Sequence, residues 1–298
     1  MNKGNFIIDV DTGIDDALAM ILASKLVKNQ VLGITTCGGN VKLEDALANT
    51  LKIVELLNWD VPVFAGAQKS TTGNEFVHAY DYHGSNGLCD IQLKGAREPE
   101  KKSAVDFIIE SAEEGEISIV CLATPTNLAQ AISKKPSICK KIKSVFLMGG
   151  AINVPGNQTE YAEYNFFQDP FAVEAVLKNI KNCFVVPLDV TNQCIVADSL
   201  VPTIKDNGSN ILKFVKEAIS NWYRFFGYPK KRQFELYDPL TITAAANLDY
   251  LEFKDVKMGV NTQGLREGEI FIGGKYAVKL AQTVRAREFL GFFLKNIK

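Results

Sequence analysis

The stretch F-I-I-D-V-D-T-G-I-D-D-A-L-A-M, residues 6–20, decides the fold. Its first half is a short apolar run, and its second half carries apolar residues at helical spacing. A run that is apolar on successive residues is typical of a parallel strand buried on both faces, and a helix directly after it is typical of a β-α unit. Four carboxylates lie where the predicted strand gives way to the predicted helix: Asp9, Asp11, Asp15 and Asp16.

Similar units follow along the chain. Strand-like runs lie at residues 6–10, 31–36, 61–66, 117–123, 144–150 and 183–189, and helical spacing lies at 15–27, 43–57, 103–114, 126–132 and 169–180. Beyond residue 190 the pattern is mainly helical, at 209–228 and 238–248, before strand-like segments at 258–262 and 268–273 and an amphipathic end at 287–297. We therefore expect an α/β fold, a single Rossmann-like domain over residues 1–298. Its mainly parallel central sheet would carry helices on both faces and lead into a helical C-terminal region.

Composition limits the kinds of partner. The 298 residues are 47% hydrophobic and 22% charged, which excludes an intrinsically disordered chain. Lys plus Arg number 33 against 34 Asp plus Glu, so the net charge of -1 gives no basis for binding nucleic acid or an anionic membrane surface. No segment has the roughly 18 to 20 uninterrupted apolar residues that a membrane span needs. We expect neither a nucleic-acid nor a membrane partner.

The cysteines indicate the compartment. Six cysteines lie far apart without a C-x-x-C pair, several of them inside apolar runs. Such cysteines are typical of buried thiols in a reducing compartment rather than of a disulfide or zinc framework. The apolar run near the N-terminus is also too short for the core of a signal peptide. These features predict a cytoplasmic protein.

The four carboxylates after the first strand are the first candidates for a site, because ligands of open parallel sheets bind beyond the carboxyl ends of the strands. Carboxylates this close repel one another unless a cation, a helix N-terminus or solvent offsets their charge. Helix capping explains only one or two of the four. Hard oxygen ligands without a nearby His or Cys favour Ca²⁺ or Mg²⁺ over zinc, so we expect a divalent-cation site.

Two other acidic motifs fit less well. An EF-hand loop starting at Asp9 would need Gly and Glu where the chain has Ile14 and Met20. A phosphatase of the haloacid dehalogenase type also opens with a strand ending in Asp-x-Asp, but its pattern continues into Thr or Val and a flexible cap. Here Gly13 and the next two carboxylates begin the helix at once. A separate feature, the irregular stretch 66–100, is long enough for a functional loop.

The motif D-V-D-T-G-I-D-D, residues 9–16, resembles the D-x-D-x-G-x-D-D fingerprint that opens the inosine-uridine-preferring nucleoside hydrolases. Further blocks follow in that family's order and extend the resemblance to residue 240. They are C-G-G-N (37–40), H-G-S-N-G-L (83–88), A-T-P-T-N (123–127), M-G-G-A (148–151), G-N-x-T-x-x-A-E-Y-N-F (156–166), D-P (169–170), P-L-D-V-T (187–191) and Y-D-P-L (237–240).

The resemblance implies hydrolysis of the N-glycosidic bond of a ribonucleoside such as inosine or uridine, with a bound Ca²⁺ that orients and acidifies the water and grips the ribose diol. A site rich in carboxylates suits this reaction, because departure of the base builds positive charge on the ribose ring. By similarity, Asp11 is a metal ligand and the general base, and Asp16, Asp238 and the carbonyl of Thr126 are further ligands. Asp9 then supports the site from the end of the strand.

The resemblance also assigns the contacts of the substrate. By similarity, Asp15, Asn157, Glu163 and Asn165 bind the ribose hydroxyls, Met148 lies against the sugar, Asn40 helps to hold the water, and His83 lies near the substrate. Alternatives stay open for isolated features: the glycine pairs 38–39 and 149–150 can simply end strands, and the polar residues near 157–165 can form a solvated loop. For His78, the other histidine, we favour a surface position.

The chain departs from the family's pattern at the leaving-group position. Many members carry His directly before the late metal-binding Asp, where this chain has Tyr237, and a phenol is a weaker proton donor at neutral pH than an imidazole. Either Tyr237 donates or hydrogen-bonds in a low-dielectric pocket, or stacking activates the base and solvent protonates it. Stacking aromatics are available in the stretch 222–228, unless that stretch is a core-facing stripe: Trp222, Tyr223, Phe226 and Tyr228.

Two further departures leave functional alternatives. The family's G-P-L-T-N appears as A-T-P-T-N, which weakens the assignment of Thr126, and the His that often follows P-L-D-V-T is Asn192. A non-catalytic nucleoside or ribose binder descended from such an enzyme, or an Asp-x-Asp phosphatase, is therefore the alternative to a hydrolase. The expected partner is a small-molecule ribonucleoside, and the resemblance implies a homo-oligomer, a dimer or a tetramer, with a role in nucleoside salvage.

Overall fold

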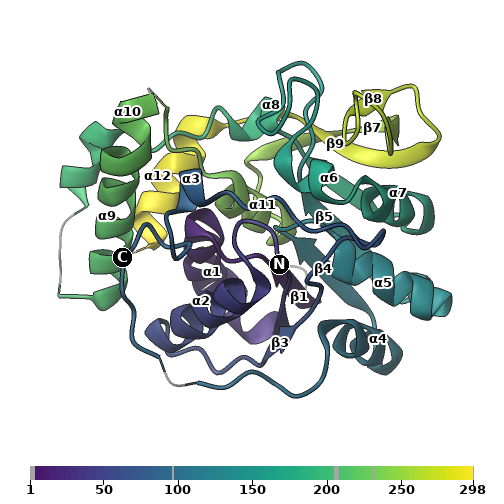
Figure 1. Ribbon diagram of the computed structural model, residues 1–298, viewed down its shortest axis with the longest axis horizontal. Helices are drawn as coiled ribbons and strands as arrows, with labels where there is room; N and C mark the ends of the chain where they lie inside the picture. The colour runs from purple at the N-terminus through teal and green to yellow at the C-terminus, as the bar shows by residue number, and fades with distance from the viewer. Residues whose placement is uncertain (1–3, 96, 205–207, 231, 298) are drawn as a thin grey trace.

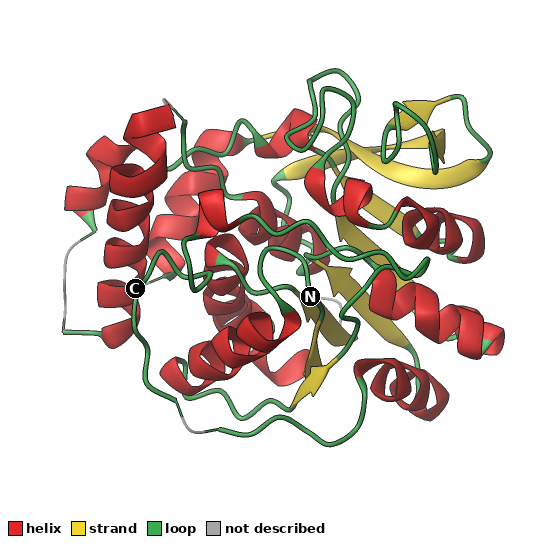
Figure 2. Ribbon diagram, in the orientation of Figure 1, coloured by secondary structure: helices red, strands yellow, loops and turns green. Residues whose placement is uncertain are grey.

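A nine-stranded sheet runs through the computed structural model in the order β3-β2-β1-β4-β5-β6-β9-β7-β8 (Figure 2). The structure describes residues 4–95, 97–204, 208–230 and 232–297. Six strands pair in parallel in the first part of the sheet: β1 (Asn5–Val10), β2 (Val31–Thr36), β3 (Val63–Ala65), β4 (Ile117–Cys121), β5 (Ile142–Met148) and β6 (Cys183–Val186). The predicted α/β fold with a mainly parallel sheet is confirmed.

Helices connect these strands and cover both faces of the sheet (Figure 1). The longer connecting helices are α1 (Ile14–Leu26), α2 (Leu43–Leu56), α4 (Ala104–Glu114), α5 (Thr126–Lys134) and α7 (Pro170–Asn179), and the short ones are α3 (Tyr80–His83), α6 (Tyr164–Gln168) and α8 (Leu188–Thr191). The C-terminal part adds α9 (Asn210–Trp222), a π-helical turn (Tyr223–Gly227), α10 (Tyr228–Lys230), α11 (Tyr237–Ala245) and α12 (Ala286–Asn296).

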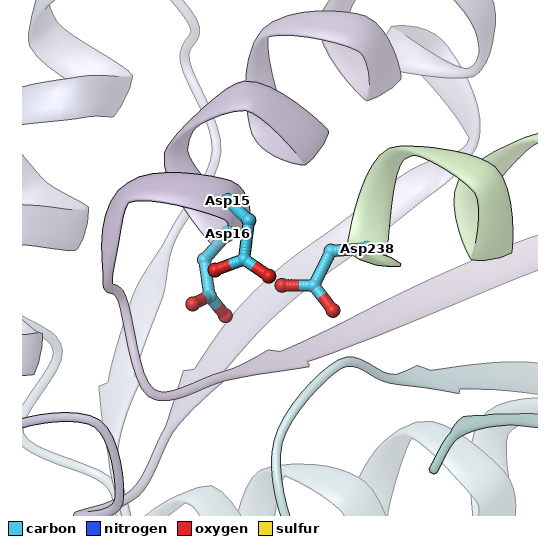
Figure 3. A group of neighbouring side chains, drawn as sticks. All are labelled: Asp15, Asp16 and Asp238. Atoms are coloured by element: carbon cyan, nitrogen blue, oxygen red, sulfur yellow. The ribbon is translucent and has the colours of Figure 1, made fainter. Parts of the chain in front are cut away.

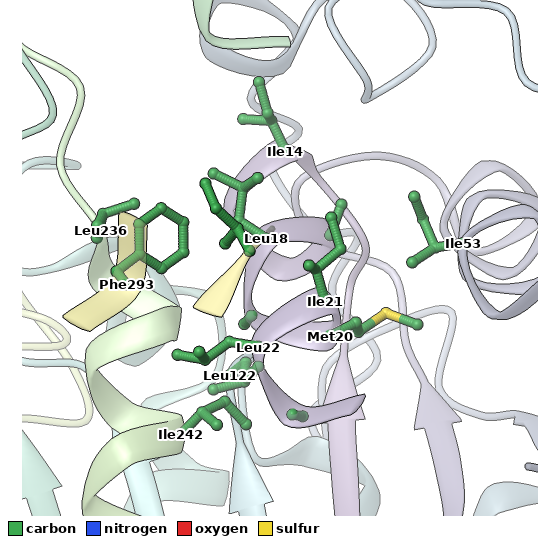
Figure 4. Packing of buried hydrophobic residues seen from close by; sticks show 14 of the residues in the cluster. Ile14, Leu18, Met20, Ile21, Leu22, Ile53, Leu122, Leu236, Ile242 and Phe293 are labelled. Atoms are coloured by element: carbon green, nitrogen blue, oxygen red, sulfur yellow. The ribbon is translucent and has the colours of Figure 1, made fainter. Parts of the chain in front are cut away.

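Alternate residues of the buried strands belong to two separate cores. Ile8 and Val10 of β1 pack in the larger core with α1, α2, α9, α11 and α12, whereas Ile7 packs in a second core with α4, α5 and α7. Figure 4 shows part of the larger core, where Phe293 of α12 lies beside Leu18 of α1. Because both faces of the strands are buried, the sequence needs continuous apolar runs there rather than alternation.

The end of the sheet differs from the prediction. The C-terminal strands are β7 (Leu251–Val260), β8 (Ile270–Ile272) and β9 (Tyr276–Val284); β9 pairs parallel with β6 and antiparallel with β7. The sequence indicated β8 and only the end of β7, and it missed β9, because β9 mixes buried and exposed residues without a regular alternation. Its inner residues Leu280 and Ala281 are both buried, and a register shift interrupts its pairing with β7.

The long irregular stretch 66–100 crosses the carboxyl ends of the strands. Hydrogen bonds to residues 164–169 hold it in place. The backbone N–H of Val77 donates to Gln168 Oε1 (2.9 Å), and Tyr164 Oη donates to the Val77 carbonyl (2.5 Å). Asp169 accepts hydrogen bonds from the backbone N–H (2.6 Å) and the hydroxyl (2.7 Å) of Thr71. These contacts place the loop over the region where the predicted site residues converge.

Asn127 at the start of α5 joins the ends of three neighbouring strands. Its side-chain N–H₂ donates to Asp9 Oδ1 (2.8 Å) at the end of β1 and to the Thr36 carbonyl (3.0 Å) at the end of β2. Its Oδ1 accepts from the Ala67 N–H (2.9 Å), just beyond β3. A buried amide with all these partners fixes the relative positions of the strand ends.

No helix within the described ranges is both long enough and apolar enough to cross a membrane.

Replacing Asn127 by Ala should lower the free energy of unfolding by about 2–4 kcal/mol, because it leaves buried groups unpaired at about 1–3 kcal/mol each. Urea denaturation followed by circular dichroism measures the change. Asn179→Ala is the control: its side chain is exposed and bonds only within its own helix, to the Ala175 carbonyl, so the change should stay within about 0.5 kcal/mol. Equal stability of the two variants would contradict the role given to Asn127.

Candidate active site

Three acidic side chains from two distant segments meet beyond the carboxyl ends of the strands. Asp15 and Asp16 lie in the first turn of α1, and Asp238 lies in the first turn of α11. Each offers a carboxylate oxygen, and these oxygens all lie within 4.8 Å of one another. Figure 3 shows the three carboxylates pointing toward one another. The predicted convergence of the opening motif with position 238 is present in the fold.

Capping of helix α1 accounts for only one of the carboxylates, that of Asp16. Asp16 Oδ2 accepts from the Gly13 N–H (2.9 Å), and Asp16 Oδ1 accepts from the Asp11 N–H (3.3 Å). Asp15 is different: its Oδ1 is buried and has no hydrogen-bond partner among the described residues. A buried carboxylate oxygen without a partner is unfavourable on its own, so the cluster needs something beyond helix capping.

Asn40 links Asp11 to the same cluster. The backbone N–H of Asn40 donates to Asp11 Oδ2 (2.7 Å), and its side-chain N–H₂ donates to Asp11 Oδ1 (3.0 Å) and Asp16 Oδ2 (3.1 Å). The approach requires glycine at the preceding position, because a Cβ on Gly39 would lie 2.0 Å from Asp11 Oδ2. Gly39 therefore does more than end the strand: it lets the turn after β2 close on Asp11.

The electrostatics of the cluster favour a hard cation. Burial is the main cause that raises the pKa values of Asp11, Asp15, Asp16 and Asp238, and the charge of Asp16 raises those of the other three further. Buried carboxylates that face one another are compatible with ionisation when a divalent ion replaces their lost hydration. The donor set consists of hard oxygens, which suits Ca²⁺ or Mg²⁺. The residues present therefore fit a divalent-cation site.

Asp9 lies behind the cluster, at the end of β1. Its Oδ1 accepts from Thr35 Oγ1 (2.5 Å) and from Asn127, while its Oδ2 is buried and unpaired among the described residues. Burial raises the pKa of Asp9 to about 7, against the effect of these two hydrogen bonds. Asp9 does not line the cavity, which agrees with a supporting position.

Thr126 is held at the start of α5 by a hydrogen bond of its hydroxyl. Its hydroxyl donates to Asp169 Oδ2 (2.8 Å), and Thr126 is fully buried at the start of α5 without lining the cavity. The role of its carbonyl as a ligand stays a prediction.

A cavity of about 580 Å³ opens beside the acidic cluster, within the usual size of small-molecule sites. Its lining includes nine of the residues singled out in the sequence: Asp15, Asn40, His83, Met148, Asn157, Glu163, Asn165, Tyr237 and Asp238. It also includes residues that sequence reasoning missed, chiefly Asp81, Tyr82, Tyr164, Arg232, Gln233 and Glu235. Tyr82 directly precedes the predicted His83, and Glu235 stands between two apolar residues, which was the only signal for it.

Two members of the polar group at 157–165 belong to the interior rather than to a solvated loop. Glu163 caps α6 and accepts from the N–H groups of Asn165 (2.8 Å), Phe166 (3.1 Å) and Gly150 (3.0 Å). Burial nevertheless raises the pKa of Glu163 to about 7. Asn165 donates to the Leu122 carbonyl (2.7 Å), whereas Asn157 is more exposed and accepts from the Tyr164 N–H (2.8 Å).

His83 lines the cavity but is fixed as a neutral ring. Its Nδ1 accepts from the Ile14 N–H at the start of α1 (3.1 Å), so its proton lies on Nε2. Burial lowers the pKa of His83 to about 3. The ring can donate one hydrogen bond toward the cavity, but it cannot act as a cationic acid near neutral pH. His78 is partly buried, and its Nδ1 lies 2.8 Å from the Gly39 carbonyl.

The aromatic residues of the stretch 222–228 do not line the cavity. Trp222 and Tyr223 are buried in the larger core, as in the alternative of a core-facing stripe, and Phe226 packs against that core. Tyr228 is exposed, and its hydroxyl bonds to Asp198. Trp222 lies on the buried face of α9, where it supports Tyr82 by an edge-on contact with ring centroids 5.2 Å apart.

Comparison with known proteins identifies the family of this chain. Residues 6–291 match the profile of the family described as "Inosine-uridine preferring nucleoside hydrolase". Uridine nucleosidase 1 of Arabidopsis thaliana is 33% identical, covering 88% of this chain and 80% of that protein. The solved plant nucleoside hydrolase PpNRh1 superposes with a TM-score of 0.92 at 27% identity over 99% of both chains. The purine-preferring ribonucleoside hydrolase from Gardnerella vaginalis superposes with 0.92 at 28% over 98% of both.

The chain belongs to the inosine-uridine preferring nucleoside hydrolase family. It is a hydrolase that acts on N-glycosidic bonds.

Because His83 accepts a backbone hydrogen bond and is buried, its ring should stay neutral, with the proton on Nε2, from pH 8 down to pH 5. ¹⁵N NMR of histidine-labelled protein measures this directly, since the chain has only two histidines and a His78→Gln variant assigns the signals. Protonation of His83 near pH 6.5, its ordinary range, would show that the ring is not held in this way.

Glu163→Gln should flatten the pH dependence of stability. The folded pKa of about 7 lies above the ordinary 4.5, so the contribution of Glu163 is full below pH 4.5 and is lost as the pH rises through 7. The parent should therefore lose up to about 3 kcal/mol more than the variant between pH 4.5 and 8. Urea denaturation in chelator-treated buffer measures the difference, and the exposed Glu160→Gln serves as control. Parallel profiles for Glu163→Gln and the parent would contradict the shift.

Proposed function

We propose that this chain hydrolyses the N-glycosidic bond of ribonucleosides, in a calcium-dependent reaction that yields free base and ribose. The observation that carries the proposal is the convergence of Asp15, Asp16 and Asp238 at one end of the cavity, with Asp11 joined to them through Asn40. A phosphatase that used Asp9 as nucleophile is disfavoured, because Thr35 and Asn127 hold Asp9 Oδ1 at the strand ends, whereas Asn40 joins Asp11 to the acidic cluster.

Ca²⁺ is proposed as the cation, held by Asp11, Asp16 and Asp238, with the Thr126 carbonyl as a further ligand suggested by the family resemblance. When bound, the ion would supply positive charge that acidifies a water molecule and attracts the two neighbouring ribose hydroxyls. Asp15 contributes to the same acidic group and lines the cavity, so it suits a ribose hydroxyl as well as the ion.

Asp11 is the proposed general base. Asn40 holds both of its oxygens, one through the backbone N–H and the other through the side chain, so the carboxylate has a fixed orientation. In the proposed step, Asp11 takes the proton of the attacking water as the water oxygen bonds to C1′ and the bond to the base nitrogen breaks. The surrounding carboxylates stabilise the positive charge that builds on the ribose ring, more in the transition state than in the neutral substrate.

Further side chains would orient the sugar. Asn157, Glu163, Asn165 and Met148 line the cavity near the acidic cluster and match the ribose contacts of the family. The hydrogen bonds of Glu163 and Asn165 to the surrounding backbone hold both side chains in place before a substrate binds, which lowers the cost of ordering them.

The departure of the base involves Tyr237, which lies next to Asp238 in the first turn of α11. Burial raises the pKa of Tyr237, and the charges of Glu235 and Asp15 raise it further. A phenol in this setting is a hydrogen-bonding group rather than a strong acid, so protonation of the base from solvent is the alternative route. One relative is named as a uridine nucleosidase, and a similar solved structure is named as purine-preferring. The base preference of this chain therefore depends on the residues that line its own cavity.

The biological setting is part of the proposal. Five of the six cysteines are buried and all six are free, which suits a reducing compartment, and we propose a cytoplasmic role in nucleoside salvage. A homodimer or homotetramer is proposed from the family resemblance alone.

The test is release of free ribose from a panel of purine and pyrimidine ribonucleosides with 2′-deoxy controls. Asp11→Asn should lower kcat by about 10²- to 10⁴-fold, the size of a general-base contribution. Asp255→Asn, an exposed residue of β7 far from the cluster, should behave like the parent. Removal of metal by a chelator should abolish turnover until Ca²⁺ is added, and 2′-deoxyribonucleosides should fail.

Ribose release that is unaffected by both chelation and Asp11→Asn would overturn the proposed mechanism. Tight nucleoside binding with no ribose product would favour the alternative of a non-catalytic binder.

A further inference from the structure

We propose that Glu235 is a specificity-determining residue of this cavity. Its carboxylate accepts a hydrogen bond from a ring N–H of the base, while neighbouring donors of the protein bind the adjacent carbonyl of the base. The inference rests on the proposed function, because it assigns the base of a ribonucleoside to the part of the cavity that the ribose contacts leave open.

The backbone fixes the direction of Glu235. Residues 234–236 pair with residues 194–196 in a short antiparallel bridge, through Val196 N–H to the Phe234 carbonyl (2.9 Å) and Leu236 N–H to the Cys194 carbonyl (2.9 Å). Phe234 and Leu236 are fully buried in the larger core. Because side chains alternate along an extended segment, Glu235 points the opposite way, where it lines the cavity.

Two tyrosines connect Glu235 to the acidic cluster. Tyr82 and Tyr237 line the same cavity as Glu235, and Tyr237 directly precedes Asp238 in the first turn of α11. Both rings therefore share the cavity with the acidic cluster and with Glu235. A ribose held at Asp15 and Asp238 places its base along the tyrosines, with the far edge of the base at Glu235.

This part of the cavity combines one carboxylate with several hydrogen-bond donors. The buried Tyr82 hydroxyl lies near Glu235 and Tyr237, yet it forms no well-aligned hydrogen bond with any described residue. Its ring is held by Trp222. Burial raises the pKa of Glu235, whereas the Tyr237 and Tyr82 hydroxyls and the positive charge of Arg232 favour its ionised form. Arg232, an exposed residue, also lines the cavity and is a permanent donor.

The combination selects a class of base. Glu235 accepts, and the Tyr82 hydroxyl and the Arg232 guanidinium donate, so the complementary edge has a ring N–H beside a carbonyl. Oxopyrimidines such as uracil and oxopurines such as hypoxanthine present this edge. In the amino bases cytosine and adenine the corresponding ring nitrogen is an acceptor, which would face the carboxylate oxygens and leave buried groups unpaired.

The test compares kcat/KM for uridine, cytidine and 3-methyluridine, and for inosine and adenosine, in the parent and in Glu235→Gln. The parent should prefer uridine to cytidine and to 3-methyluridine, whose methyl group replaces the ring N–H. Glu235→Gln should reduce the uridine-to-cytidine ratio by about ten- to a hundredfold, the range for a hydrogen bond to a charged group. Glu217→Gln, an exposed residue of α9, is the matched control and should leave the ratio unchanged. A ratio between substrates is insensitive to the amount of folded enzyme.

An unchanged ratio in Glu235→Gln, with both substrates still turned over, would overturn the assignment of Glu235. If the parent releases no ribose from any ribonucleoside, the proposed function fails separately. The role of Glu235 is then decided by calorimetric binding of uridine and cytidine to the same two proteins: the ratio of their Kd values should change in Glu235→Gln, and an unchanged ratio refutes the role.

Discussion

Repulsion between carboxylates buried in one place is the constraint on which this site depends. Two unit charges about 4 Å apart repel by about 4 kcal/mol in surroundings of intermediate polarity. Asp15, Asp16 and Asp238 offer oxygens within 4.8 Å of one another, and the charge of Asp11 adds to theirs. The backbone just before α1 offsets part of this charge, because the N–H groups of Asp11 and Gly13 donate to Asp16. The remaining negative charge requires a cation. The same negative charge also stabilises a ribose ring that becomes positive as the base departs. Binding of the ion and stabilisation of the transition state thus have one physical origin.

Many polar contacts hold the carboxylates in this arrangement. Asn127 ties the ends of β1, β2 and β3 together, Asn40 joins Asp11 to Asp16, and Asp169 bonds both to Thr126 and to Thr71 in the long loop. Asn40 and Asn127 lie in the segments that follow β2 and β4, whereas Asp169 caps α7, so backbone from separate β-α units converges here. Rigid polar support of this kind keeps the carboxylates close although their charges oppose it.

Much of this could be predicted from the sequence, for identifiable reasons. The parallel strands were visible because burial on both faces requires continuous apolar runs, and the acidic site was visible because four carboxylates follow the first of them. Strand β9 was missed because it is covered unevenly and mixes Lys279 and Gln282 with buried neighbours. Trp222 was assigned to stacking or to the core because helical spacing alone does not say which face is buried. Glu235 was missed because its position depends on a bridge to residues 194–196, a pairing that no local pattern indicates.

Calorimetric titration of the metal-free protein with Ca²⁺ at neutral pH tests the cation requirement most directly. One ion should bind per chain in the parent, and Asp238→Asn should abolish or greatly weaken that binding although Asp238 lies far in sequence from the opening motif. A folded parent that takes up no Ca²⁺ even at millimolar concentration, or an Asp238→Asn protein that binds it as tightly as the parent, would contradict a shared cation among these carboxylates.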